Sequence, residues 1–299
     1  YSINKIIKMT FDNIIKNKWS QIRDNKTVKN KFKGIFEIEV KEFMAIFKEK
    51  NSKVVSSLID KLTEGQIILI KNTFSKQFVN SLKDKNIEYW KNTKPSFHKM
   101  LQGCPNFHRI VKPETAKKYS VQAVRHISYF FPWNKDELNI REDIYKIWRP
   151  CKKLAGLNYK EYESNTPNDG KVDRIQIACY PPKCGGIERH YDSSKNIPVV
   201  VSGYLSSKKN KDFYDGGFYC INNDEEKVDI EKSIDIGDVS IFLSSIEHGV
   251  DNVETNKEFD LEKYDWNSGY GRWWLGLFTA DSDHLIERDT SVSLEERLY

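Results

Sequence analysis

The chain has 299 residues, enough for one large β-rich domain or two smaller ones. Lysine and arginine total 48 against 43 acidic residues, and this net charge of +5 is spread along the chain, which does not indicate a nucleic-acid partner. No stretch approaches the roughly twenty apolar residues of a membrane span. The five cysteines lack paired zinc-type spacing. We therefore expect a soluble, cytoplasmic protein with reduced thiols, and a monomer.

Residues 1–30 are rich in lysine and carry apolar residues at roughly helical spacing, among them Phe11, Ile15 and Trp19. A basic amphipathic helix can lie on a membrane surface or bind an acidic partner. More often such a helix packs its apolar stripe on its own domain and leaves its lysines in water, and we favour this interpretation. We expect residues 1–60 to form an N-terminal helical extension of a single domain that spans 61–299.

The rest of the first half is predicted to be mostly helical. Residues 32–49 and 74–91 show apolar positions at intervals of three and four, which indicates two helices. Between them, residues 67–70 form a continuous aliphatic run that predicts a strand.

Residues 125–133 combine Arg125 with a dense aromatic group. Arg125 could hold a carboxylate of a small molecule, with Tyr129 or Trp133 as a wall of the site. An ordinary surface arginine beside hydrophobic residues explains the same pattern equally well. The remaining histidines have no carboxylate partner at ligand spacing, and we expect them to be structural; they are His98, His108, His126 and His284.

Residues 174–180 alternate between polar and apolar side chains, so they predict a strand with one face in a core. Arg174, Gln176 and Tyr180 share the other face. That face either lines a cavity or is solvated, and the alternation alone leaves both possibilities open.

The strongest motif is His190 and Asp192, which are separated only by Tyr191. In an extended segment residues i and i+2 point to the same side, so the two side chains can close on one ion. Further along, residues 239–243 are typical of a buried strand, and His248 follows that strand. Two imidazoles and one carboxylate can hold one face of an Fe(II) ion and leave the opposite face open.

A last predicted strand, residues 269–278, places Arg272, Trp274 and Gly276 on one face. Because an unpaired buried charge is very costly, Arg272 needs an anionic partner. A dicarboxylate cosubstrate would be such a partner.

His-x-Asp, then Gly-Asp-Val-x-Ile-Phe, then His-Gly-Val and finally an arginine on a strand together resemble the Fe(II)/2-oxoglutarate-dependent dioxygenases, over residues 173–278. The resemblance implies that His190, Asp192 and His248 bind iron and that Arg272 pairs with the distal carboxylate of 2-oxoglutarate. O2 would take the open metal position. Gln176 and, second, Tyr180 become candidates for the metal-proximal carboxylate.

Two departures accompany the resemblance. Residues 254–268 widen the interval between His248 and Arg272, and we interpret them as an inserted surface loop. Many members carry serine or threonine two residues after the arginine, where this chain has Trp274. The hydroxyl of Tyr204 or Ser240 could replace it.

The implied fold is α+β and β-rich: an antiparallel double-stranded β-helix, or cupin-like jelly roll, at about residues 120–280 with an N-terminal helical cover. The implied reaction abstracts hydrogen from a substrate carbon and releases succinate and CO2. Asp192 disfavours halogenation, because halogenating relatives lack this ligand.

We expect a small-molecule substrate, with Arg125, Arg174 and Tyr191 as candidate contacts. The chain also resembles enzymes of specialised metabolism such as the kainoid synthases of red algae, which close a pyrrolidine ring on an amino-acid-derived polycarboxylate. A hydroxylase of proteins or other macromolecules, and a metal-free ligand-binding jelly roll, remain alternatives. The presence of all three ligands together with Arg272 favours the enzyme.

Overall fold

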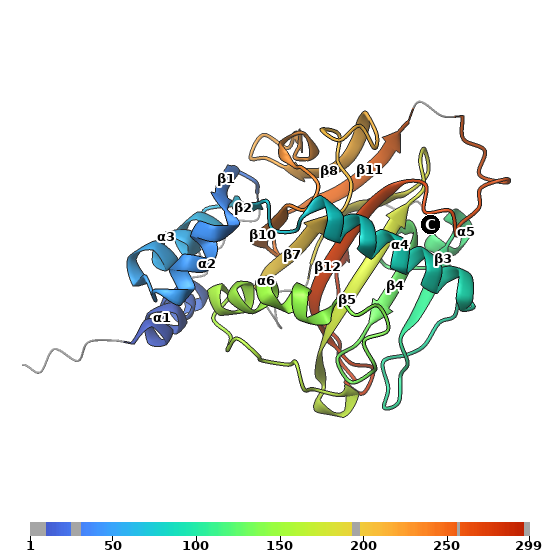
Figure 1. Ribbon diagram of the computed structural model, residues 1–299. Helices are drawn as coiled ribbons and strands as arrows, with labels where there is room; N and C mark the ends of the chain where they lie inside the picture. The colour runs from blue at the N-terminus through green and yellow to red at the C-terminus, as the bar shows by residue number, and fades with distance from the viewer. Residues whose placement is uncertain (1–9, 25–30, 193–197, 256–257, 296–299) are drawn as a thin grey trace, which may run out of the picture.

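The computed structural model describes residues 10–24, 31–192, 198–255 and 258–295. Its centre is a pair of facing antiparallel sheets, between which the chain alternates from β5 to β12 (Figure 1). The major sheet contains β5 (Lys171–Tyr180), β7 (Val199–Tyr204), β10 (Val239–Leu243) and β12 (Arg272–Asp281). The minor sheet contains β6 (Gly186–Tyr191), β8 (Asp215–Ile221), β9 (Lys227–Asp229) and β11 (His248–Glu254).

The strand order identifies the fold. The major sheet runs β10-β7-β12-β5 and the minor sheet β6-β11-β8-β9, with antiparallel pairing throughout. A chain that crosses from one sheet to the other at nearly every strand winds a double-stranded β-helix. The predicted β-rich jelly-roll fold is therefore confirmed.

Further strands extend both sheets. β1 (Gly34–Glu39) and β2 (Gln66–Lys71) pair in parallel and join the major sheet beside β10. At the opposite edge, β3 (Phe107–Val111) pairs with β4 (Ala123–Phe130), which bonds to β5 of the major sheet and to β6 of the minor sheet. The short β13 (Val292–Ser293) also pairs with β6.

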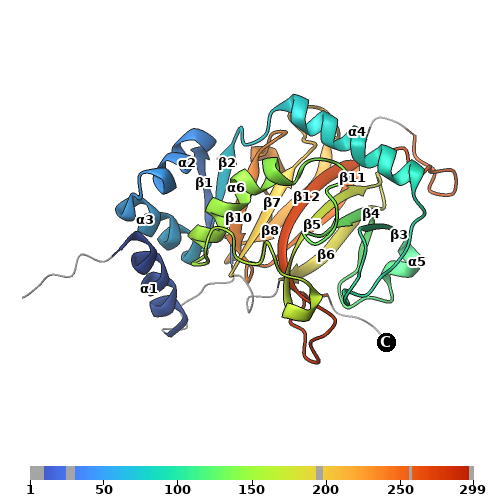
Figure 2. The same ribbon diagram turned by 60° about the horizontal axis from the view of Figure 1, so that its bottom comes forward.

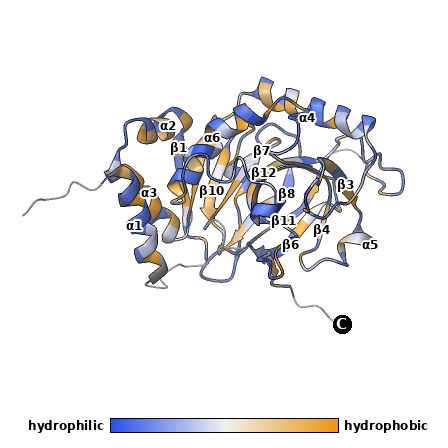
Figure 3. Ribbon diagram, turned by 90° about the horizontal axis from the view of Figure 1, so that it is seen from below, coloured by the Kyte–Doolittle hydropathy of each residue, from blue (hydrophilic) through white to orange (hydrophobic). Residues whose placement is uncertain are grey.

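Helices cover the outer face of the major sheet and its β1–β2 edge (Figure 2). The long ones are α1 (Phe11–Asp24), α2 (Val40–Lys48), α3 (Ser52–Thr63), α4 (Lys76–Asn92) and α6 (Arg141–Leu154). Three short helical elements lie elsewhere: α5 (Pro113–Ala116) contacts β4, and the 3-10 turns η1 (Pro167–Asp169) and η2 (Glu231–Ser233) contact β5 and β8. Figure 3 shows hydrophobic and hydrophilic residues alternating along these helices, as expected where one face is buried.

Two predicted elements in the first half are confirmed and one is wrong. β2 and α4 match the predicted strand 67–70 and helix 74–91. Residues 32–49, however, are not one helix, because Gly34–Glu39 form β1 and only Val40 onward is helical. The spacing of the apolar residues in this stretch is compatible with both a helix and a strand, and residues 34–39 form a strand because they pair with β2.

Helix α1 packs against the domain. Phe11, Ile15 and Trp19 are buried, and the Trp19 indole donates a hydrogen bond to the carbonyl of Leu154 (2.8 Å). The prediction that the apolar stripe of this helix packs on its own domain therefore holds for α1. Residues 1–9 and 25–30 of the same predicted segment lie outside the described residues. Within the described ranges, no helix combines the length and apolar character that crossing a membrane requires.

Candidate active site

His190, Asp192 and His248 meet in the structure as the spacing predicted. His190 lies near the end of β6, and the antiparallel register places His248, the first residue of β11, directly opposite it. Asp192 follows β6 on the same side of the chain as His190. One ligand atom from each residue lies within 4.8 Å of the others, and Asp192 Oδ2 is 3.6 Å from Nε2 of His248.

Both imidazoles are oriented by backbone carbonyls. His190 Nδ1 lies 2.7 Å from the carbonyl oxygen of Glu188, and His248 Nδ1 lies 2.8 Å from that of Ile246. A proton on Nδ1 that donates to these carbonyls leaves Nε2 as the unprotonated ligand atom. Burial, followed by the neighbouring His190, lowers the pKa of His248 to about 4, so this imidazole is neutral and able to bind a metal at neutral pH.

The donor set fits a divalent transition metal. Two neutral imidazoles and one carboxylate on one side of a cavity form the facial arrangement that suits Fe(II) and leaves open coordination positions. Each donor comes from an ordered strand or its immediate end, so little rearrangement is needed for binding.

These three residues lie in the wall of a cavity of about 320 Å³ between the two sheets. The other predicted site residues that line it, from the major sheet and β4, are Arg125, Arg174, Gln176, Tyr180 and Arg272. Tyr191 does not line it. Its side chain is on the other face of β6 because neighbouring strand residues alternate, and we withdraw it as a substrate contact.

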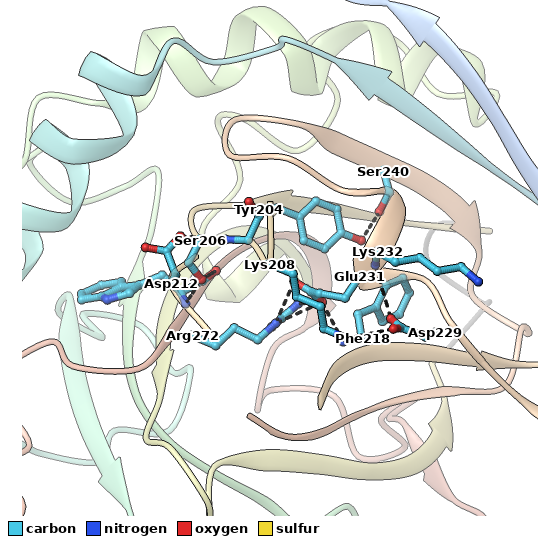
Figure 4. A network of polar contacts seen from close by, with 12 residues as sticks. Tyr204, Ser206, Lys208, Asp212, Phe218, Asp229, Glu231, Lys232, Ser240 and Arg272 are labelled. Carbon is cyan, nitrogen blue, oxygen red and sulfur yellow. Dashed lines mark hydrogen bonds and ion pairs between the residues drawn. The ribbon is translucent and has the colours of Figure 1, made fainter. Parts of the chain in front are cut away.

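Arg272 has an anionic partner within the protein, which the sequence did not reveal. It is 1% exposed, and its Nε and Nη2 donate to the carboxylate of Glu231, with Nη2 2.9 Å from Oε2 (Figure 4). Glu231 is fully buried in η2 and also accepts a hydrogen bond from the backbone N–H of Phe218 (2.7 Å). Gly217 makes room for this carboxylate, since a Cβ there would lie 2.8 Å from it.

The pair leaves one edge of the guanidinium available to the cavity. Glu231 occupies the side formed by Nε and Nη2, while Arg272 Nη1 is buried and has no hydrogen-bond partner among the described residues. A guanidinium has five N–H donors in a planar fork, so the Nη1 end can still receive a carboxylate. The hydroxyl of Tyr204, which also lines the cavity, is 2.8 Å from Ser240 Oγ.

Arg125 and Arg174 bring positive charge to the same cavity. Arg125 Nη1 donates to the Tyr180 hydroxyl (3.3 Å). With the Gln176 amide turned so that its oxygen faces the guanidinium, Arg174 Nη2 and Nε donate to that oxygen (2.6 and 2.7 Å). Neither arginine forms an ion pair with a carboxylate within the part of the chain that the structure describes. Burial lowers the pKa of Arg174, as expected for a guanidinium that lacks such a partner.

Two segments outside the predicted strands are also built into the structure, one in the core and one in the cavity wall. Trp266, inside the predicted insertion 254–268, is buried, and its carbonyl oxygen lies 2.7 Å from Nδ1 of His126. Arg288 and Ser291, beyond β12, line the cavity. The isoleucines around Glu231 were a weak sequence signal that this acid is buried; they are Ile230, Ile234 and Ile236.

Comparisons with known proteins find similarity in structure alone. No protein-family model and no curated protein matches the sequence. A prolyl hydroxylase from Trichoplax adhaerens, solved with a hypoxia inducible factor peptide fragment, is 16% identical with a TM-score of 0.49, covering 79% of this chain and 92% of its own. A full-length Neurospora crassa protein, solved in complex with alpha-KG and thymine, is 12% identical (TM-score 0.48, coverages 86% and 87%).

A third structure, a Pseudomonas putida prolyl-4-hydroxylase, is 14% identical with a TM-score of 0.47, covering 75% of this chain and 97% of its own. At such low identity, a function for this chain has to be inferred from the residues of its own cavity.

Proposed function

We propose that the protein is an Fe(II)- and 2-oxoglutarate-dependent oxygenase. The observation that carries this proposal is that the His190, Asp192 and His248 cluster and the free Nη1 of Arg272 belong to one cavity of the jelly roll. A metal donor set on the minor sheet and a buried cationic donor on the facing major sheet suit a ligand that chelates at one end and is anionic at the other.

His190, Asp192 and His248 would hold the iron, and Arg272 would receive the distal carboxylate of 2-oxoglutarate at its Nη1 end. Gln176 and Tyr180 are the candidates for the metal-proximal carboxylate. When bound, iron and 2-oxoglutarate activate O2 for hydrogen abstraction, with release of succinate and CO2. The chain itself would orient the cosubstrate in the cavity between the two sheets.

The substrate we propose is a small, amino-acid-derived carboxylate, whose oxidation gives a hydroxylated or cyclised product as in the kainoid synthases. Arg125 and Arg174 support this, because two cavity arginines without a carboxylate partner among the described residues favour an anionic ligand. A volume of about 320 Å³ suits a small molecule better than a protein segment. Asp192 completes the ligand set and so argues against halogenation.

We further propose that residues 61–299 act as the oxygenase domain and residues 1–60 as an N-terminal extension, whose described part also adds β1 to the major sheet, in a monomer of the cytoplasm. The five cysteines are all free thiols in the structure, which agrees with a reducing compartment.

Anaerobic titration with Fe(II) and 2-oxoglutarate tests the reaction class. We expect the weak visible charge-transfer band of the metal-bound keto acid, and succinate formation once air is admitted. His248→Ala should abolish both signals, whereas Arg272→Ala should mainly weaken cosubstrate binding. A wild-type protein that gives neither band nor succinate would contradict the proposal. Substrate-stimulated succinate release from a panel of amino-acid-derived acids would then identify the substrate.

A further inference from the structure

After β12, the chain returns to the cluster formed by His190, Asp192 and His248. We define the C-terminal strap as residues 283–294. Within it, the backbone N–H of Asp289 donates to Asp281 Oδ2 (2.9 Å), and the strand β13 pairs with β6 alongside Tyr191 and His190. The N–H of Leu294 donates to the carbonyl of Arg189 (3.0 Å). The strap is thus attached on both sides of the residues that face the cavity.

Ser291 is the point where the strap touches the metal cluster. Its hydroxyl donates to Oδ1 of Asp192 at 2.5 Å, in the range of a charge-assisted hydrogen bond. The backbone N–H of Asp192 in turn donates to the carbonyl of Ser244 (2.8 Å). Main chain and side chain of this ligand are therefore fixed by different segments.

A carboxylate needs such a contact if it is to offer one defined oxygen. The torsion that rotates the carboxylate of an aspartate is broad and roughly two-fold, so packing alone defines it poorly. With Oδ1 engaged by Ser291, Oδ1 lies 3.8 Å from Nε2 of His190 and Oδ2 lies 3.6 Å from Nε2 of His248. The hydrogen bond selects one orientation of the carboxylate relative to the two imidazoles.

We propose that Ser291 is a positioning residue, which fixes the carboxylate of Asp192 for metal binding and thereby makes the C-terminal strap part of the metal site. This inference rests on the proposed function, because it takes the His190, Asp192 and His248 cluster to be the iron site. Residues that hydrogen-bond to a metal ligand in this way typically contribute about 10- to 100-fold in metal affinity.

The experiment is a titration with Co(II), whose visible absorption reports binding and coordination without any turnover. We expect Ser291→Ala to weaken Co(II) binding by about 10- to 100-fold and to change the shape of the Co(II) spectrum. Ser291→Thr keeps the hydroxyl and should restore both. Ser293→Ala is the matched control, because Ser293 is in the same strap and its hydroxyl accepts from the N–H of Glu295 instead.

Limited digestion with trypsin distinguishes the loss of the Ser291 hydroxyl from detachment of the whole strap. Arg288 is a cleavage site within the strap, so its rate of cleavage reports detachment. We expect that rate to be the same in wild type and Ser291→Ala. If cleavage rises together with the loss of affinity, detachment rather than the hydroxyl explains the loss, and the assignment to Ser291 is overturned.

The outcomes also distinguish this inference from the proposed function. If wild type and His248→Ala bind Co(II) equally, the cluster is not a metal site and the proposed function fails. If wild type binds Co(II) through the cluster and Ser291→Ala binds it with the same affinity and spectrum, only the role of Ser291 is refuted.

Discussion

Glu231 and Arg272 form a fully buried ion pair in which the carboxylate engages the Nε and Nη2 side of the guanidinium. The pair carries no net charge, so the Nη1 of Arg272, a residue that lines the cavity, is a held hydrogen-bond donor without a partner among the described residues rather than part of an isolated cation. Arg125 and Arg174, in contrast, have no carboxylate partner among the described residues. The lining of the cavity therefore combines these two arginines, which have no ion-paired carboxylate in the described part of the chain, with the acidic side chains of Asp192, Asp281 and Asp289.

Removing Glu231 should destabilise the fold strongly. Glu231→Ala leaves the Arg272 charge buried and unpaired, and breaking such a pair typically costs about 3 to 5 kcal/mol of unfolding free energy. Urea denaturation monitored by tryptophan fluorescence measures the change. Glu226→Ala, which removes an exposed acid from the same region, should change stability by less than about 0.5 kcal/mol. Equal effects of the two variants would show that the Glu231–Arg272 pair contributes nothing.

Neutralising Arg125 or Arg174 should weaken substrate binding and spare the cosubstrate. A hydrogen bond to a charged group contributes about 1.5 to 3 kcal/mol, so Arg125→Met and Arg174→Met should each lower kcat/KM for the substrate by about tenfold or more. Substrate-stimulated succinate release measures this. The affinity for 2-oxoglutarate, titrated through the charge-transfer band, should change much less, because Arg125 and Arg174 would reach the cosubstrate only through Tyr180 and Gln176. A fall in both quantities would place the two arginines at the cosubstrate instead.

The meeting of His190, Asp192 and His248 was predictable because the information is local. His190 and Asp192 need only an extended backbone to face the same way, and His248 needs only a strand end next to them. The register of β6 with β11 then places His248 opposite His190, and the pairing of these strands follows from the jelly-roll order. The placement of Arg272 and Trp274 on one face of β12 followed in the same way from alternation, and both residues line the cavity.

The partners of these residues were not predictable for the opposite reason. Glu231 lies in a three-residue 3-10 turn, where no periodicity separates a buried acid from a solvated one. Ser291 is in a polar stretch near the chain end, and only β13 pairing brings it to Asp192. The strand β1 was mistaken for a helix because its pairing with β2 depends on a parallel contact across two intervening helices.

A buried histidine pair should make the fold acid-sensitive. His126 Nε2 lies 2.7 Å from His108 Nδ1, and its Nδ1 lies 2.7 Å from the carbonyl oxygen of Trp266. Burial lowers the pKa of His126 from 6.5 to about 3. The unfolded chain therefore binds a proton more readily than the folded one between these values. Stability that is fully present above about pH 6.5 is lost as the pH falls toward 3, on the order of 4 to 5 kcal/mol in total.

Urea denaturation at a series of pH values measures this loss. His126→Gln keeps a donor and an acceptor but does not titrate, so its unfolding free energy should fall less steeply between pH 6.5 and 3. His98→Gln, at an exposed position, serves as the control and should keep the wild-type slope. If His126→Gln and wild type show the same slope, another group is responsible for the acid sensitivity.

Gly276 keeps space for the aromatic wall of the cavity. A Cβ at this position would lie 2.2 Å from Cη2 of Trp274 and 2.7 Å from Cε2 of Phe278, and both rings line the cavity. Gly276→Ala should therefore push the Trp274 ring away from β12 into the cavity. Overpacking of this kind typically costs about 1 to 3 kcal/mol. The cavity should become smaller, while His190, Asp192 and His248, on the minor sheet, stay in place.

We expect Gly276→Ala to raise KM for the substrate while leaving the Co(II) affinity unchanged. The double variant Gly276→Ala with Trp274→Phe replaces the indole by a smaller ring and should recover much of the substrate binding, because Cη2 of Trp274 is the atom nearest the new methyl group. A crystal structure of the single variant would show the ring displacement directly. An unchanged KM in Gly276→Ala would mean that Trp274 does not contact the substrate. The substrate would then have to bind in the part of the cavity nearer Arg125 and β4.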